Sequence, residues 1–211
     1  MEALINTRYL SALLSAALLI TACKKDDDEE VVDTPTTREF TITSNGNVNT
    51  VEGNSDVSYT FTNDKVWLLK NFVYVESGAT LTIQPGTIIK GDKDTKGTLI
   101  IKRGAKIMAE GTASQPIVFT SNQAIGSRAA GDWGGVIICG KAKNNQPGGE
   151  ATVEGGVEAT YGGTDDTDNS GVLRYARIEF PGIPFQPNQE INGLTLASVG
   201  RGTTIDHIQV S

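Results

Sequence analysis

The chain has 211 residues, a formal net charge of −7 and 24 glycines, whereas only 6% of its residues are aromatic. The sequence contains no basic patch. This argues against nucleic-acid binding, because contacts to a phosphate backbone require clustered lysines and arginines. The two cysteines, Cys23 and Cys139, lack C-x-x-C spacing and therefore form no zinc site.

Residues 1–22 are typical of a secretory signal peptide. Arg8 provides a basic start, and the uncharged run over residues 10–20 is about 11 residues long, where roughly 20 are needed to span a bilayer. The leader ends in ITAC, which resembles the lipobox of bacterial lipoproteins. In that family the cysteine thiol is acylated, so the resemblance implies a lipid such as palmitate on Cys23. The alternative is an ordinary cleaved signal beside a coincidental cysteine.

Residues 23–38 are predicted to be a flexible tether. Two lysines precede DDDEE, whose mutual repulsion keeps the chain solvated, and Pro35 among threonines favours extended chain. One interpretation is a spacer between a membrane and a folded domain. The other is an address, because the run resembles the acidic export signal of surface lipoproteins in Bacteroidota. That resemblance implies a lipid anchor in the outer membrane, with the protein facing the cell exterior.

The rest of the chain is predicted to be all β. Short β-branched segments broken by glycines continue to the last residues, and helical periodicity is absent after the leader. VESGATLTIQPGT (75–87) aligns with IKRGAKIMAEGT (101–112) at a period of 26, which matches Leu81 with Ile107. A period in the twenties without helices indicates a β-solenoid. An antiparallel sandwich would explain the alternation but not the repeat.

Segments such as WLLKNFVYVESGATLTIQPGTIIKG, GDWGGVIICGKA and DNSGVLRYARIEF resemble β-helix lipoproteins of Bacteroidota. The resemblance covers residues 66–211 and implies a right-handed parallel β-helix of the pectate-lyase-like type. It implies no activity, because members of that family are mostly functionally undefined. Residues 39–65 fit less well and are predicted to form a β cap on the first coil. The chain ends in a strand without a polar cap, so we expect it to be truncated; the alternative is a last coil that is left open or covered by a partner.

A calcium site is one interpretation of the turn that contains Asp165, Asp166, Asp168 and Asn169, whose oxygens begin with the spacing of an EF-hand loop. Arg177 stands where that loop needs a bidentate glutamate, so an EF-hand is excluded. Two alternatives stay open, a looser Ca²⁺ site and a solvated corner with Asx turns. No other cofactor is expected.

Two further residues stand out. Trp133 lies in GDWGG, where its ring could contact a ligand such as a sugar or pack in the corner of a coil. Cys139 lies in an apolar strand, VIIC, which is typical of an unreactive core cysteine, so no disulfide with Cys23 is expected.

Catalysis needs groups that the sequence does not bring together. Inverting hydrolysis of a polysaccharide requires two carboxylates around a water, and lyase chemistry requires a base. The only tandem acidic pair of the β body is Asp165 with Asp166, and His207, the only histidine, is about 40 residues away. We therefore expect a non-catalytic structural, adhesin-like or glycan-binding surface protein whose partners are the membrane and a glycan or surface protein. The alternative is a fragment of a polysaccharide lyase or glycoside hydrolase.

Overall fold

The structure is a computed structural model that describes residues 36–186 and 189–211. The predicted signal peptide, Cys23 and the acidic run lie outside the described residues. Within them the chain forms short β-strands, and the single helical element is a 3-10 turn at Pro147–Gly149. No helix in this part of the chain is long and apolar enough to cross a membrane. The predicted all-β fold is confirmed.

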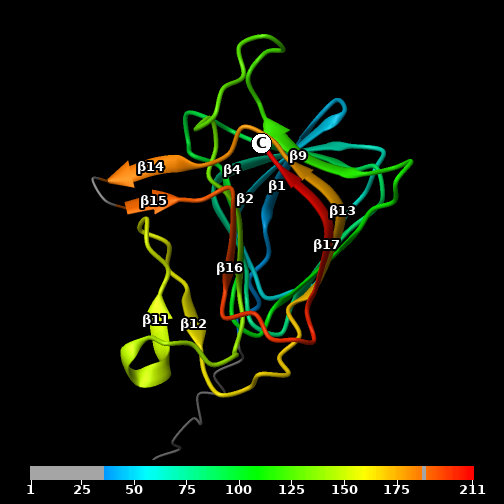
Figure 1. Cartoon of the computed structure of the whole chain (residues 1–211). Helices are drawn as coiled ribbons and strands as arrows, with labels where there is room; N and C mark the ends of the chain where they lie inside the picture. The colour runs from blue at the N-terminus through cyan, green and yellow to red at the C-terminus, as the bar shows by residue number, and fades with distance from the viewer. Residues whose placement is uncertain (1–35, 187–188) are drawn as a thin grey trace, which may run out of the picture. The chain divides into compact units, whose positions relative to one another are not determined.

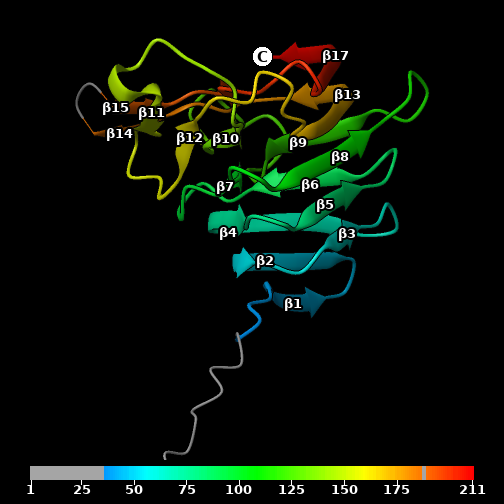
Figure 2. The ribbon, with the colours of Figure 1, turned by 90° about the horizontal axis from the view of Figure 1, so that it is seen from below.

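Strands of successive coils stack in parallel on three faces (Figures 1 and 2). The first face contains the starts of β2 (Val48–Ser55) and β4 (Val66–Val75), then β6 (Ile88–Gly91), β9 (Ile117–Ser121) and the ends of β13 (Gly171–Ile178) and β17 (Thr204–Val210). The second face contains the ends of β2 and β4, then β7 (Thr98–Ile101), β10 (Gly135–Cys139) and β16 (Leu194–Ala197). The third face contains β3 (Tyr59–Phe61), β5 (Thr80–Ile83), β8 (Lys106–Glu110) and the starts of β13 and β17. This arrangement is a parallel β-helix.

The repeat in the sequence is the stacking register of the third face. β5 pairs with β8 so that Leu81 lies beside Ile107, as the period of 26 predicts. Gly78 and Gly104 occupy equivalent corners before these strands, with φ of 90° and 89°. Residues with a side chain rarely adopt this conformation, which explains why the glycines recur. The antiparallel sandwich is thereby excluded.

Inward-facing side chains form a continuous apolar core. Val73, Leu99 and Val136 occupy one position in three consecutive coils of the second face, and none of them has exposed surface. Burying a side chain of this size contributes roughly 1.5–3 kcal/mol relative to leaving it exposed. Because each coil adds another member to such a column, the stacking itself supplies the core.

At the N-terminal end of the stack, β1 (Thr41–Asn45) pairs antiparallel with β2 along the edge that β4 does not occupy. Parallel stacking begins at β2, within residues 39–65, where the sequence predicts a cap. The outermost parallel strand is therefore covered by β1 at this end, which leaves fewer backbone groups available for pairing with another chain.

Two insertions leave the coils and carry hairpins. The insertion between β10 and β13 contains β11 (Glu150–Thr152) and β12 (Thr160–Gly162), and the insertion between β13 and β16 contains β14 (Ile183–Gln186) and β15 (Gln189–Ile191). Both hairpins lie on the same side of the stack in Figure 2.

The insertions pack on the outer surface of the second face. Outward-facing Ile100 and Ile137 form a second hydrophobic cluster with Val157 and Ile191 from the insertions. The hydroxyl of Tyr74 also accepts a hydrogen bond from the backbone N–H of Glu158, at 3.1 Å. One side of the solenoid therefore carries an additional layer, and a groove is formed there.

Candidate functional site

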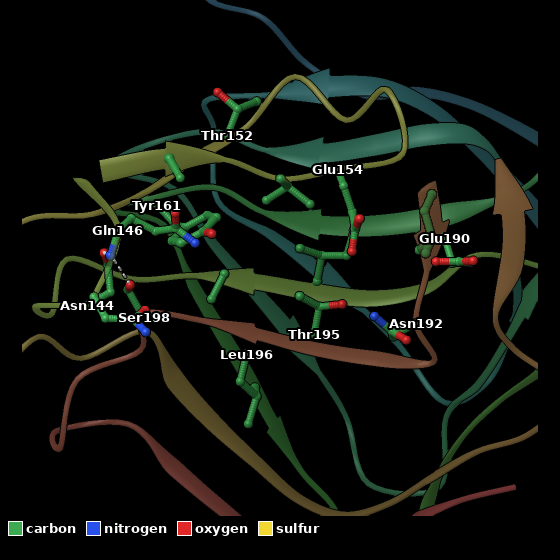
Figure 3. A pocket seen from close by; sticks show the side chains of 16 residues that line it. Asn144, Gln146, Thr152, Glu154, Tyr161, Glu190, Asn192, Thr195, Leu196 and Ser198 are labelled. Carbon is green, nitrogen blue, oxygen red and sulfur yellow. Dashed lines mark hydrogen bonds between the residues drawn. The ribbon is translucent and has the colours of Figure 1, made fainter. Parts of the chain in front are cut away.

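A groove with a volume of about 530 Å³ opens on the second face between the two insertions (Figure 3). Ile137 of β10 and Thr195 of β16 are register partners and form part of its floor. Tyr161 of β12 lines one wall, whereas Glu190 of β15 and the following Asn192 line another. Four strands, β10, β12, β15 and β16, thus converge on one concave surface.

Asn144 fixes the first insertion to the end of β16. Its amide nitrogen donates to the hydroxyl of Ser198, at 2.9 Å, and to the carbonyl of Gly149, at 3.1 Å. Its amide oxygen accepts a hydrogen bond from the backbone N–H of Gln146, at 2.8 Å. Ser198 has φ of 52°, which turns the chain sharply at this point. The groove wall is therefore held by several short contacts, and Asn144 has a positioning role.

Other polar side chains of the groove are free to bind a ligand. Within the described residues, no side-chain hydrogen bond is formed by Gln146, Thr152, Asn192 or Thr195. The first three are exposed and Thr195 is half-buried. Hydroxyl and carboxamide groups both donate and accept, so this lining suits a ligand that presents neutral polar groups.

Two carboxylates also line the groove. Glu154 follows β11, and Glu190 lies on β15. Figure 3 shows both toward one end of the groove, near Thr195 and Asn192, while Tyr161 lies toward the other end. Neither glutamate forms an ion pair within the described residues. No spacing in the sequence signals this pair, because the two residues belong to different insertions.

The predicted calcium ligands are occupied by local hydrogen bonds. Asp165 accepts from the hydroxyl and backbone N–H of Thr167, and Asp166 accepts from the backbone N–H of Lys143. These hydrogen bonds lower the pKa of both carboxyl groups. Asp168 is buried and accepts from the backbone N–H of Lys141, at 3.0 Å.

Asn169 acts as an Asx turn, because its side-chain oxygen accepts the N–H of Gly171 at 2.8 Å. Among the described residues, no group of three or more His, Cys, Asp or Glu side chains is arranged to hold a metal ion. The observed geometry is that of a hydrogen-bonded corner, and calcium binding by this turn stays a prediction.

Trp133 does not offer a surface to a ligand, contrary to the hypothesis from its glycine-rich setting. Its side chain has no exposed area, and its indole N–H donates to the carbonyl of Glu179, at 2.8 Å. A Cβ added to Gly91 would lie 2.4 Å from the Cβ of Trp133, so the glycine of the preceding coil makes room for this residue. The alternative interpretation, packing inside a coil corner, is correct.

Cys139 is a core residue, as its strand predicts. It is fully buried on β10, and burial raises the pKa of its thiol to about 12, although Lys102 and Arg103 oppose this shift. The thiol is therefore protonated and unreactive at neutral pH.

None of the residues that line the groove is among those that the sequence predicts for a site. A signal is nevertheless present: residues 140–170 interrupt the repeat and are rich in Asn, Thr and Gly. Insertions of this kind in solenoids map to one face, which is often the binding face. The register of the repeat is lost inside such an insertion, so its contacts cannot be assigned from spacing.

The stacked coils, the buried columns and the groove between insertions define a parallel β-helix protein with one elaborated face. Residues 53–211 match the family described as pectate-lyase like beta helix domain. The match covers more than half of the chain, and the protein belongs to this family. Comparison with curated proteins and with solved structures found no match.

Proposed function

We propose that the protein is a non-catalytic β-helix that binds glycans in its groove. The observation that supports this function most is the lining, where neutral polar side chains without partners among the described residues lie beside apolar ones. Glycans combine hydroxyl groups with apolar ring faces. Half-buried Tyr161 and exposed Leu196 supply apolar surface, and Gln146, Asn192 and Thr195 supply donors and acceptors.

Replacing Thr195 with valine tests the groove. The substitution removes one hydroxyl at nearly constant side-chain size, and a neutral hydrogen bond contributes about 0.5–1.5 kcal/mol. We expect affinity for a glycan selected on an array to fall roughly two- to tenfold by calorimetric titration. Thr82→Val is the matched control, because Thr82 is a half-buried outward threonine on the third face. Equal weakening by both substitutions, or retention of no glycan, would rule out the groove as a glycan site.

Glycoside hydrolysis is the second candidate function, because Glu154 and Glu190 line the same groove. Hydrolases of this class use two carboxylates that flank the scissile bond. Incubating the protein with the glycans of the array separates the two functions. New reducing ends that disappear in both Glu154→Gln and Glu190→Gln would support catalysis. Retention of a glycan without turnover would support binding alone.

We further propose that the chain is a lipoprotein of the Bacteroidota type, anchored by Cys23 in the outer membrane and facing the cell exterior. The lipobox-like ITAC and the acidic run after Cys23 support this proposal. The tether would hold the groove away from the membrane, where it could contact a glycan or a surface protein.

Cys23→Ser is expected to abolish palmitate labelling and to release the protein from membranes, because the acyl chains provide the anchor. Labelling and fractionation of cells that express either form measure both effects. Cys139→Ser is a poor control because it alters the core, so Ser15→Ala in the leader serves instead. Unlabelled wild-type protein that leaves the membrane with salt alone would contradict the anchor.

A further inference from the structure

We propose that the groove selects its ligand by charge: it takes neutral glycans and rejects glycans that carry carboxylate or sulfate groups. This inference rests on the proposed glycan-binding function and specifies its ligand class. It is carried by the distribution of charged side chains around the second face.

The charge of the groove is negative. Apart from Tyr161, its ionisable lining residues are Glu154 and Glu190, and none of the residues that line it is a lysine or an arginine. Both carboxylates are exposed, and within the described part of the chain neither is neutralised by an ion pair. A bound anionic group would therefore meet like charges without a compensating cation.

Three cations near the first insertion contact groups outside the groove. Arg103 forms an ion pair with Glu150 and donates to the carbonyl of Gly162, at 2.8 Å. Lys102, Arg103 and Lys141 line two smaller cavities of about 330 and 350 Å³, which share no residue with the groove. These three cations thus lie outside the groove.

The groups left for recognition in the groove are uncharged. Gln146, Asn192 and Thr195 can each donate a hydrogen bond to a hydroxyl or accept one from it. A carboxylate offers only acceptors, so it could use the donors of these side chains but would be repelled by Glu154 and Glu190. Two unit charges about 4 Å apart in water interact by roughly 1 kcal/mol, which corresponds to about fivefold in affinity for each carboxylate.

The test uses neutral polysaccharides, each paired with its own carboxymethylated derivative, and measures retention by affinity electrophoresis. We expect the wild-type protein to bind a neutral polymer more tightly than its derivative. In the double variant Glu154→Gln with Glu190→Gln, affinity for the derivative relative to its parent should rise at least about tenfold. High salt should also reduce the discrimination of the wild type, because the Debye length falls to about 3 Å at 1 M.

Glu158→Gln is the matched control, because Glu158 is exposed on the same insertion but does not line the groove. It should leave the ratio of the two affinities unchanged. Wild-type protein that binds the derivative as tightly as the parent, or a double variant with an unchanged ratio, would overturn the charge selectivity alone. Failure to retain any polymer, neutral or carboxymethylated, would overturn the glycan-binding function and the selectivity together.

Discussion

Replacing Gly171 with alanine is expected to destabilise the β-helix by at least about 4 kcal/mol. Gly171 begins β13 with φ of 109°, and a Cβ added there would lie 1.9 Å from the carbonyl oxygen of Ile107. That oxygen belongs to β8, the parallel partner of β13, so it cannot move without disturbing the ladder. Urea unfolding followed by circular dichroism measures the loss.

Gly126→Ala is the control that separates two costs of the Gly171 substitution, the steric clash with β8 and the strain of a positive φ. Gly126 has φ of 89° in an exposed loop, and no atom lies within 4 Å of an added Cβ. Its substitution should therefore cost only the roughly 1–2 kcal/mol that a left-handed conformation imposes on an ordinary residue. Equal losses for the two variants would show that β8 and β13 do not approach as closely as the register requires.

The stacking of β5 on β8 could be predicted from sequence because both strands follow a glycine corner at the same offset. Leu81 and Ile107 sit three residues after Gly78 and Gly104, and the period brings each pair into register. Uninterrupted coils repeat their corners, and where a corner needs glycine, the glycines recur at a fixed spacing in the sequence. The fold class is therefore encoded in the regular part of the chain.

Trp133 shows why a single glycine-rich motif does not predict whether a side chain is exposed or buried. Its own glycines suggest an open corner, whereas its burial depends on Gly91, which lies in the preceding coil. That partnership crosses a loop of irregular length, so no fixed spacing signals it. The same physical reason hides Glu154 and Glu190: each lies in an insertion, and only folding of both insertions on the second face brings them to one groove.

The second large effect is expected at Asp132, where substitution by alanine should cost about 2–4 kcal/mol at neutral pH. The side chain of Asp132 is fully buried and accepts hydrogen bonds from Lys93, at 2.8 Å, from Ser121, at 2.6 Å, and from the backbone N–H of Ala129, at 3.0 Å. These contacts join the turn after β6 to the end of β9 and to the loop between β9 and β10. Removing the carboxylate leaves the buried hydroxyl of Ser121 without its acceptor.

The contribution of Asp132 should depend on pH. Burial by itself raises the pKa of this carboxyl group, but the hydrogen bonds from Lys93, Ser121 and Ala129 outweigh burial, so its pKa is lowered in the folded protein. A lowered folded-state pKa means that the stabilisation is complete above the unfolded-state pKa of roughly 3.9 and is lost as the pH falls through the folded-state value. The difference in unfolding free energy between wild type and Asp132→Asn should therefore shrink on acidification.

Asp64→Asn is the control for this titration, because Asp64 is exposed and forms no ion pair within the described residues. Its substitution should change the free energy of unfolding by less than about 0.5 kcal/mol at neutral pH. Urea titrations at neutral pH and near pH 3 compare the three proteins. An Asp132→Asn variant as stable as Asp64→Asn would show that the buried carboxylate does not link the coils. A stability difference that stays constant across this pH range would instead show that ionisation of Asp132 is not what stabilises the corner.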